Sequence, residues 1–418
     1  MKKLTLSILL LAATFLSTRA QHALQLGGDL SMLPQYEKAN TPYYDNKGKK
    51  INDVITYLNG TCLWNAARTR LFVAPTPSGD RQVTQDLAYV TSLGQRIKSK
   101  GMDLLVDFHY SDTWADPSQQ SIPANWATSN TALTDSMYSY TKRSLQHHVD
   151  NGATPDFVQI GNEVSYGMLW RNANDRCYSN NGSTPWARFA NFLNAAAKAV
   201  REVTPAAKII IHVERTGDTN STIEFYNKMK SYNVDYDIIG LSYYPFWHGT
   251  LANFSTTLDR LATSFPNKPV QVVETAYYYQ DFPSKDVTNT TGTWPATPAG
   301  QKAFLDDLIA ELVTHDNVTG LYYWFPEENG NGGTSWSADN LVLKKWISRG
   351  LWDNATHKAN SGLYTLQHFL SAKEAVSIHT TTTQQHNDAP IYNIRGQRVT
   401  HLHAPGLYIQ NGKKILKK

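Results

Sequence analysis

Two glutamates each stand at the end of an apolar run, and a pair of carboxyl groups is the minimum equipment for cleaving a glycosidic bond. Glu163 ends the run Phe157-Val-Gln-Ile-Gly-Asn-Glu, and Glu274 ends Val270-Gln-Val-Val-Glu. In a retaining cleavage one carboxylate is the nucleophile, while the other acts first as an acid and then as a base. We therefore interpret the two residues as a candidate catalytic pair. The alternative is that both are structural ion-pair partners.

Neighbouring side chains offer the support that such a pair needs. Asn162, directly before Glu163, could donate a hydrogen bond to a sugar 2-hydroxyl. Arg68 or Arg70, together with Tyr243 or Tyr244, could keep Glu274 ionised and oriented.

The elements that must position these groups are strand-like runs rich in Val and Ile, alternating with amphipathic stretches. Eight units of this kind predict a (β/α)8 barrel, a fold in which strand ends meet at one catalytic mouth. A doubly wound open sheet is the alternative, but no Gly-rich phosphate loop follows the first strand. Helices are predicted over Thr84 to Lys100 and Pro185 to Val203. The expected strands are Leu24 to Asp29, Ala67 to Val73, Asp103 to His109, Phe157 to Asn162, Lys208 to Val213, Ile238 to Tyr243, Val270 to Glu274 and Gly320 to Trp324.

Polar and aromatic residues gather where these strands end. Asp107 and His109 close the third strand, and Trp324 closes the last. Eleven Trp are many for 418 residues, and several stand in predicted loops. Most can be packing residues, but as a set their flat rings suit the apolar faces of sugars.

The two ends of the chain differ in character from the middle. Residues 1 to 20 read as a secretory signal with Lys2 and Lys3 before an apolar stretch that is too short to span a membrane. Its removal would lower the net charge from +4 to +1, which gives no reason to expect nucleic acid as a partner.

We predict a catalytic barrel over residues 21 to 377, a polar linker over 378 to 389 and a small β-rich segment over 390 to 418, with short strands around a turn at Asn411-Gly412. That segment is similar to the C-terminal sorting modules of secreted Bacteroidetes proteins. Cys62 and Cys177 could pair, but two cysteines do not make a disulfide framework.

Longer motifs carry a resemblance to glycoside hydrolase family 53, whose members are arabinogalactan endo-β-1,4-galactanases, and to the wider clan A of (β/α)8 glycosidases. The resemblance covers about residues 24 to 370, and the loops after the third and sixth strands are its most specific parts. Its motifs are Gly28-Asp29-Leu-Ser31, Arg68-Thr-Arg70, Asp107-Phe-His109-Tyr-Ser-Asp112-Thr-Trp114-Ala-Asp116-Pro117, Gly161-Asn-Glu163, Ser242-Tyr-Tyr-Pro-Phe-Trp247-His248 and Glu274-Thr-Ala-Tyr277.

The resemblance implies an endo-acting, retaining hydrolase of pectic galactan, with Glu163 as acid/base and Glu274 as nucleophile. It implies a substrate-binding set of Asn162, Arg68, Arg70, Asp107, His109, Trp114, Tyr243, Trp247 and Trp324. Asp107 could instead be a buried structural carboxylate, and Trp324 and His109 could be packing residues.

The resemblance implies no cofactor. Some bacterial relatives bind calcium in the loop after the nucleophile, but here that loop lacks regularly spaced oxygen ligands, so we expect no metal. The family often has Asp where this chain has Glu214, which leaves the contacts of that subsite open.

Other functions are also compatible with these motifs. Many families share the catalytic pair, so a β-mannanase or β-1,4-glucanase is one alternative, and a catalytically silent glycan-binding barrel is another. A structural or adhesive protein held by its C-terminal segment would leave the mouth residues idle. We expect a monomeric protein that acts on a polysaccharide in the periplasm, on the cell surface or outside the cell.

Overall fold

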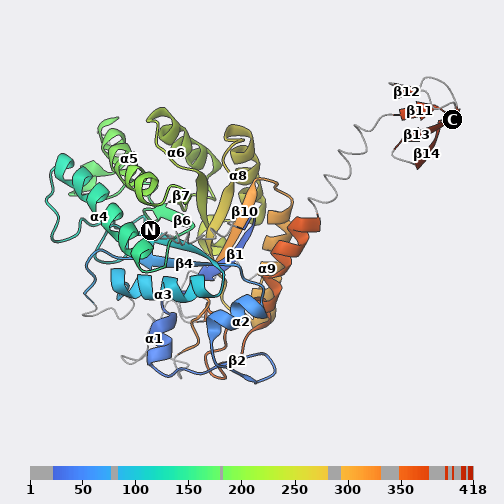
Figure 1. Ribbon diagram of the computed structural model, residues 1–418, viewed down its shortest axis with the longest axis horizontal. Helices are drawn as coiled ribbons and strands as arrows, with labels where there is room; N and C mark the ends of the chain where they lie inside the picture. The colour runs from blue at the N-terminus through green and yellow to red at the C-terminus, as the bar shows by residue number, and fades with distance from the viewer. Residues whose placement is uncertain are drawn as a thin grey trace, which may run out of the picture.

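A closed barrel of parallel strands dominates the computed structural model (Figure 1), which describes residues 22–76, 83–178, 182–280, 293–330, 348–375, 391–393, 398–399, 406–410 and 413–417. Around the barrel the strand order is β1-β10-β9-β8-β7-β6-β5-β4, so neighbours in the sequence are neighbours in space. The predicted (β/α)8 fold is therefore confirmed. The barrel strands are β1 (Gln25–Asp29), β4 (Ala66–Leu71), β5 (Asp103–Phe108), β6 (Phe157–Ile160), β7 (Lys208–Val213), β8 (Ile238–Tyr243), β9 (Val270–Thr275) and β10 (Val318–Trp324).

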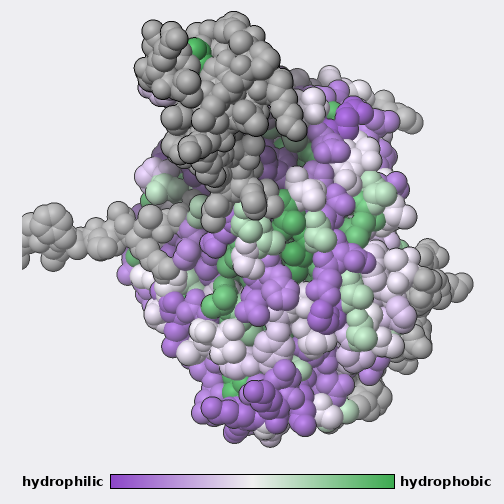
Figure 2. Space-filling view, turned by 90° about the vertical axis from the view of Figure 1, so that its right-hand side faces the viewer, coloured by the Kyte–Doolittle hydropathy of each residue, from purple (hydrophilic) through white to green (hydrophobic). Residues whose placement is uncertain are grey.

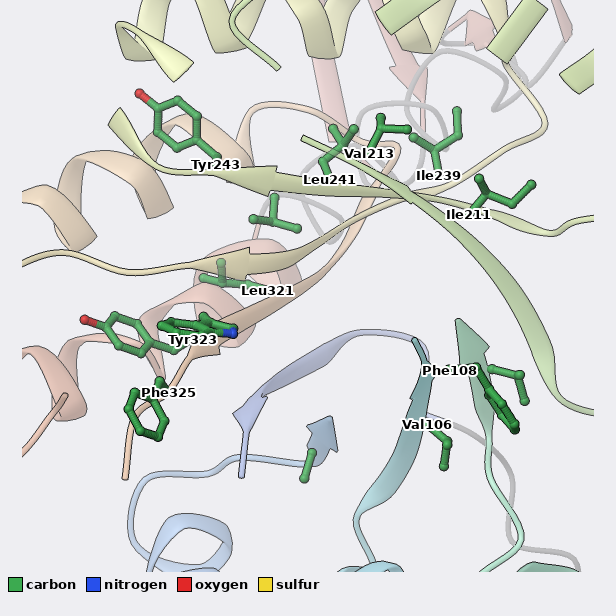
Figure 3. Packing of buried hydrophobic residues seen from close by; sticks show 14 of the residues in the cluster. Val106, Phe108, Ile211, Val213, Ile239, Leu241, Tyr243, Leu321, Tyr323 and Phe325 are labelled. Atoms are coloured by element: carbon green, nitrogen blue, oxygen red, sulfur yellow. The ribbon is translucent and has the colours of Figure 1, made fainter. Parts of the chain in front are cut away.

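Side chains alternate between the inside of the barrel and the layer beneath the helices, because successive residues of a strand face opposite ways. The lower interior is filled by a small cluster with one residue from most strands. The outward residues, such as Ile211, Val213 and Leu241, join the main hydrophobic core (Figure 3). The inner cluster consists of Ala66, Leu105, Phe157, Ile210, Ile238, Val273 and Tyr322.

Helices surround the barrel, and their ends follow local capping chemistry. The Asp86 side chain accepts a hydrogen bond from the Tyr89 backbone N–H at 2.9 Å and so starts α3, while Pro185 lies in the first turn of α5. The predicted helices are close to these two. The helices are α1 (Leu33–Lys38), α2 (Val54–Gly60), α3 (Leu87–Ser99), α4 (Asn130–Asp150), the 3₁₀ turn η1 (Ala173–Asp175), α5 (Thr184–Val203), α6 (Thr219–Ser231), α7 (Pro245–His248), α8 (Leu251–Ser264), α9 (Pro298–Val313) and α10 (Ser361–Thr365).

Two smaller sheets stand apart from the barrel strands. One is a hairpin of β2 (Tyr43–Tyr44) and β3 (Lys50–Ile51). The other is an antiparallel sheet in the order β12-β11-β13-β14 near the C-terminus. Its strands are β11 (Ile391–Asn393), β12 (Arg398–Val399), β13 (Gly406–Gln410) and β14 (Lys413–Lys417). The predicted signal at 1 to 20, the linker at 378 to 389 and the turn at Asn411-Gly412 lie outside the described residues.

Most apolar side chains, including both cysteines, are buried, and polar side chains dominate the surface. The face in Figure 2 is mainly hydrophilic, with small hydrophobic areas between polar ones. Cys62 and Cys177 are both buried and unpaired. No helix in the described ranges is long and apolar enough to span a membrane.

Candidate active site

A cleft of about 670 Å³ opens at the C-terminal mouth of the barrel, and most of the predicted site residues line it. Both candidate catalytic residues, Glu163 and Glu274, are in its wall. The other predicted residues that it contains are Asn162, Arg68, Arg70, His109, Trp114, Trp247 and Trp324. Side chains from strands far apart in the sequence thus converge on one space.

Arg68 forms the floor of this site, and its guanidinium is 1% exposed. Its Nη1 donates to Asp29 at 2.8 Å, and its Nη2 donates to Asp107 at 2.7 Å and lies 2.9 Å from Oε1 of Glu274. The same Nη2 donates to the amide oxygen of Asn162 at 2.9 Å. Arg68 therefore orients both Glu274 and Asn162, and the surrounding carboxylates compensate its buried charge.

Glu274 reaches the cleft because β9 departs from regular alternation. Gln271 and Val273 belong to the inward-facing set of this strand, so strict alternation would turn Glu274 outward. Between Leu241 and Ser242 of β8 the pairing register of β9 skips one residue, from Val272 to Glu274. Such a bulge re-aims a side chain, and here it brings the carboxylate into the mouth. Tyr244 completes the site by donating its Oη–H to Glu274 at 2.9 Å.

Glu163 has a left-handed backbone conformation with φ +47°, two residues after Gly161 with φ +95°. A non-glycine residue in such a region costs about 1 to 3 kcal/mol and is found most often at functional sites. The strained turn is held by the backbone N–H of Val164, which donates to the His212 carbonyl oxygen at 3.0 Å. The Glu163 carboxyl leaves the turn toward the cleft.

A chain of hydrogen bonds runs from His212 to Glu163. Burial lowers the pKa of His212 well below its ordinary value, so the ring is neutral. Two donors point at Nδ1, the Gln159 side-chain amide at 3.1 Å and the Glu163 backbone N–H at 3.4 Å, which favours a proton on Nε2. Nε2 lies 2.8 Å from the Ser242 hydroxyl, which in turn donates to Oε1 of Glu163 at 2.7 Å.

The two carboxyl groups differ in their acidity. Burial, and then repulsion from Glu274 and Glu214, raises the pKa of Glu163 well above its ordinary value. Burial also raises the pKa of Glu274, but Arg68 and the Tyr244 hydrogen bond oppose that rise. Glu163 therefore keeps its proton to higher pH than Glu274, which is the division of roles that an acid and a nucleophile need.

Asn162 and the aromatic residues line the walls above this pair. Asn162 donates one N–H to the Ala115 carbonyl oxygen at 2.8 Å, and its other N–H has no partner among the described residues. Arg70 lies over the ring of Trp114, with its guanidinium carbon 4.6 Å from the ring centroid. Trp324 is only 7% exposed, whereas Trp247 is 50% exposed.

Two predicted binding residues do not line the cleft, and both need correction. Asp107 is fully buried below the floor, where it accepts from Arg68 at 2.7 Å and from Gln159 at 2.6 Å, so it supports other site residues. Tyr243 points outward from β8 (Figure 3). Its ring stacks on that of Phe254, with 4.3 Å between the ring centroids. Its hydroxyl donates to the Gly249 carbonyl oxygen at 3.0 Å. The next residue, Tyr244, occupies the position that we expected for Tyr243.

Several site residues were missed by the sequence reasoning. Gln159, His212 and Ser242 are polar residues at inward positions of β6, β7 and β8, so their place in otherwise apolar strands was the available signal. Arg349 lines the cleft from a loop after β10, and no sequence signal marks it. Glu214 stands where the family often has Asp, and the sequence alone assigns it no role. It also lines the cleft, and burial raises its pKa to about 7.

Metal ligands are the remaining kind of group to consider. In the part of the chain that the structure describes, no cluster of three or more His, Cys, Asp or Glu could hold a metal ion. Most of the loop in which some relatives bind calcium, residues 281 to 292, lies outside the described ranges. The expectation of no calcium there stays a prediction.

Comparison with known proteins gives a consistent set of relatives. The sequence model of glycosyl hydrolase family 53 matches residues 25–375. A probable arabinogalactan endo-β-1,4-galactanase A from Neosartorya fischeri is 35% identical over 338 residues, which cover 76% of this chain and 88% of that protein. An endo-β-1,4-galactanase from Bacillus subtilis is 33% identical over 315 residues, 72% of this chain and 69% of that protein. The solved family 53 catalytic domain of Ignisphaera aggregans superposes with a TM-score of 0.72 at 31% identity, over 82% of this chain and 95% of that domain.

Proposed function

The chain belongs to glycosyl hydrolase family 53, and from that membership and the cleft we propose that it is an endo-acting, retaining hydrolase of β-1,4-galactosidic bonds in type I arabinogalactan. The observation that carries the proposal is a pair of carboxyls in one cleft with opposed surroundings. Glu274 is paired with Arg68 and accepts a hydrogen bond from Tyr244. Glu163 accepts a hydrogen bond from Ser242, and its pKa is raised well above the ordinary value. Relatives whose names specify galactan support the choice of sugar.

In the first step, the Glu274 carboxylate attacks the anomeric carbon while Glu163 gives its proton to the departing glycosidic oxygen. In the second step, Glu163 takes a proton from water, and that water releases the sugar from Glu274. Arg68 holds Glu274 in line for the attack, and the free N–H of Asn162 is available to the sugar 2-hydroxyl. We expect the two carboxyls to be about 5 to 5.5 Å apart, as retention requires.

The experiment is a time course on linear β-1,4-galactan with the anomeric configuration of the first products followed by NMR. We expect oligosaccharides of mixed length, which is the signature of endo cleavage, released first as the β anomer. An α anomer at early times would contradict retention. Mannan and carboxymethyl cellulose are the matched controls, and activity on either of these alone would contradict the choice of galactan.

Glycan binding without turnover is the second candidate function, since a barrel can keep its cleft and lose its chemistry. The presence of both carboxyls in the cleft speaks against it. Galactan binding without any release of reducing ends would establish it.

A polymeric substrate supports export of the enzyme, which agrees with the leader predicted at residues 1 to 20. N-terminal sequencing of the exported protein tests this proposal, and we expect the mature chain to start at Gln21. Monomeric behaviour in gel filtration is expected as well.

A further inference from the structure

We propose that Arg349 binds two adjacent hydroxyl oxygens of a galactose unit on the nucleophile side of the cleft. This inference rests on the proposed function, and it adds a residue to which neither the sequence motifs nor the catalytic steps give a role.

The first observation is that Arg349 is a buried cation without an oxygen partner. The residue is 1% exposed, and its Nε is buried with no hydrogen-bond partner. The other buried arginines each have an oxygen partner: Arg68 and Arg70 both bond to Asp29, at 2.8 and 3.1 Å, and Arg188 bonds to the Met168 carbonyl oxygen at 3.2 Å. The Nε of Arg70, like that of Arg349, is buried without a partner, but the Arg70 guanidinium is paired through its Nη1. Within the described ranges, the Arg349 guanidinium makes no hydrogen bond and no ion pair. A buried charge is costly unless it is paired, so a missing oxygen ligand is the simplest explanation.

The second observation is the cage of aromatic rings around this guanidinium. Its central carbon lies 4.7 Å from the ring centroid of Tyr278, with four further rings within 6 Å. Contacts with aromatic faces stabilise a cation, but they do not use its N–H groups as hydrogen-bond donors. The cage therefore keeps the cation in place and leaves donors for a ligand. The four further rings are those of Trp247 at 5.0 Å, Phe246 at 5.2 Å, Trp324 at 5.7 Å and Tyr244 at 5.9 Å.

The position of Arg349 identifies the part of the substrate that it can reach. It lines the same cleft as Glu274, and it contacts the ring of Tyr244, whose hydroxyl donates to Glu274. Glu274 attacks the sugar that stays on the enzyme in the first step. Arg349 therefore lies on the side of the retained sugars, across the catalytic pair from the departing chain.

The charges of the cleft select the kind of ligand. Glu163, Glu214, Glu274 and Asp116 line the same space, so a uronic acid carboxylate would meet several acidic groups. A neutral vicinal diol meets no such repulsion, and its two oxygens suit the planar fork of a guanidinium. In β-1,4-linked galactose O4 is in the linkage, while O2 and O3 are free and adjacent. We infer that Arg349 donates to this pair.

The test compares Arg349→Met, which keeps the apolar stem, with Arg349→Lys, which keeps the charge without the fork. Lys268→Met is the matched control, because Lys268 is a cation stacked 4.2 Å from the Tyr236 ring and does not line the cleft. For Arg349→Met we expect KM on linear galactan to rise about 10- to 100-fold, the loss typical of hydrogen bonds from a charged donor, with kcat within a few-fold. Arg349→Lys should recover less than half of that loss on a logarithmic scale, and the control should keep its KM.

Calorimetric titration with galactotetraose separates this inference from the proposed function. In a Glu274→Gln background, adding Arg349→Met or Arg349→Lys should weaken binding by the same factor as the rise in KM. Unchanged KM and affinity in either folded Arg349 variant would overturn the inference and leave the galactanase proposal standing. A wild type that binds galactotetraose but never cleaves galactan would overturn only the proposed turnover, and a wild type that neither binds nor cleaves would overturn both. If the protein with Arg349 intact bound galacturonate oligosaccharides more tightly than galactotetraose, the ligand of Arg349 would be a carboxylate, and this would contradict our assignment.

Discussion

At the scale of single residues, the two carboxyls differ because of their immediate contacts. Glu274 is contacted by a cation and a phenol, while Glu163 accepts a hydrogen bond from one serine hydroxyl and faces three other carboxyls. The sequence predicts both residues as a candidate pair, because each follows an apolar run directly. It does not predict the contacts, since those come from strands as far away along the chain as Arg68, which is 206 positions from Glu274.

Glu274→Gln should abolish turnover, because among the described residues Glu274 is the only carboxyl that both pairs with Arg68 and lines the cleft. Glu163→Gln should lower kcat on galactan by about 10² to 10⁴, the usual contribution of a general acid. Its first step should survive on a dinitrophenyl galactobioside, whose leaving group needs no proton. Stopped-flow detection of a dinitrophenol burst checks this, and full galactanase activity in Glu163→Gln would contradict the acid/base role.

Ser242→Ala should move the basic limb of the kcat/KM profile to higher pH by about one unit. The Ser242 hydroxyl donates to Glu163 and stabilises its ionised form, so losing it raises the pKa of Glu163 further. Activity falls where Glu163 loses its proton, and that point moves upward.

Ser165→Ala provides a control of opposite sign. Ser165 donates to Glu214 at 2.6 Å, so its loss raises the pKa of Glu214 and leaves more of that carboxyl neutral. With less repulsion, the pKa of Glu163 falls and the basic limb should move slightly downward. Shifts in the same direction in both variants would contradict this electrostatic account.

At the scale of elements, strand positions were predictable, while the direction of individual side chains at strand ends was not. The eight predicted strands each overlap an observed one, because runs of Val and Ile bounded by polar residues mark buried parallel strands. The sequence places Tyr243 rather than Tyr244 in the binding set, because it does not show which side chains of β8 face inward where the strand ends. The bulge at Val273 is likewise not evident in Val270-Gln-Val-Val-Glu274, although it turns Glu274, the proposed nucleophile, into the cleft.

Tyr244→Phe and Tyr243→Phe form a matched pair on adjacent positions. Tyr244→Phe removes a hydrogen bond to Glu274 and should lower kcat/KM on galactan by about 10- to 100-fold. Tyr243→Phe removes a bond to a carbonyl oxygen outside the cleft and should keep kcat/KM within about twofold. Steady-state kinetics of both variants checks the assignment, and the reverse order would restore Tyr243 to the site.

At the scale of the whole molecule, the barrel contains acidic groups that the chemistry does not use. Glu327, after β10, is fully buried, and burial raises its pKa to about 8. In the unfolded chain a glutamate has a pKa near 4.3. Between these values the folded protein holds a proton that the unfolded chain has lost, so stability falls as pH rises through this window.

Glu327→Gln should therefore flatten the fall in melting temperature between about pH 4.5 and pH 8. The amide keeps an oxygen that can accept from the Met32 backbone N–H, a bond of 2.7 Å in the wild type. Calorimetric scans of both proteins across this range check the prediction. Parallel curves would mean that Glu327 does not couple folding to pH.

A chain that stops after residue 377 should keep galactanase activity and its melting temperature. The barrel strands end at Trp324, and the family match ends at residue 375, before the C-terminal sheet begins at Ile391. A large loss of melting temperature in the truncated protein would contradict the predicted domain boundary.

The hydrogen bonds of Arg68 have a consequence for engineering. They join β1, through Asp29, to β5 and β9, through Asp107 and Glu274, so the cation that aligns the proposed nucleophile also ties together the strands at the open end of the barrel. Thermal tolerance and catalytic rate thus depend on one side chain and cannot be selected separately at this position. A variant library directed at the mouth of the barrel will encounter a trade-off there, whereas the helical shell can be stabilised without affecting turnover.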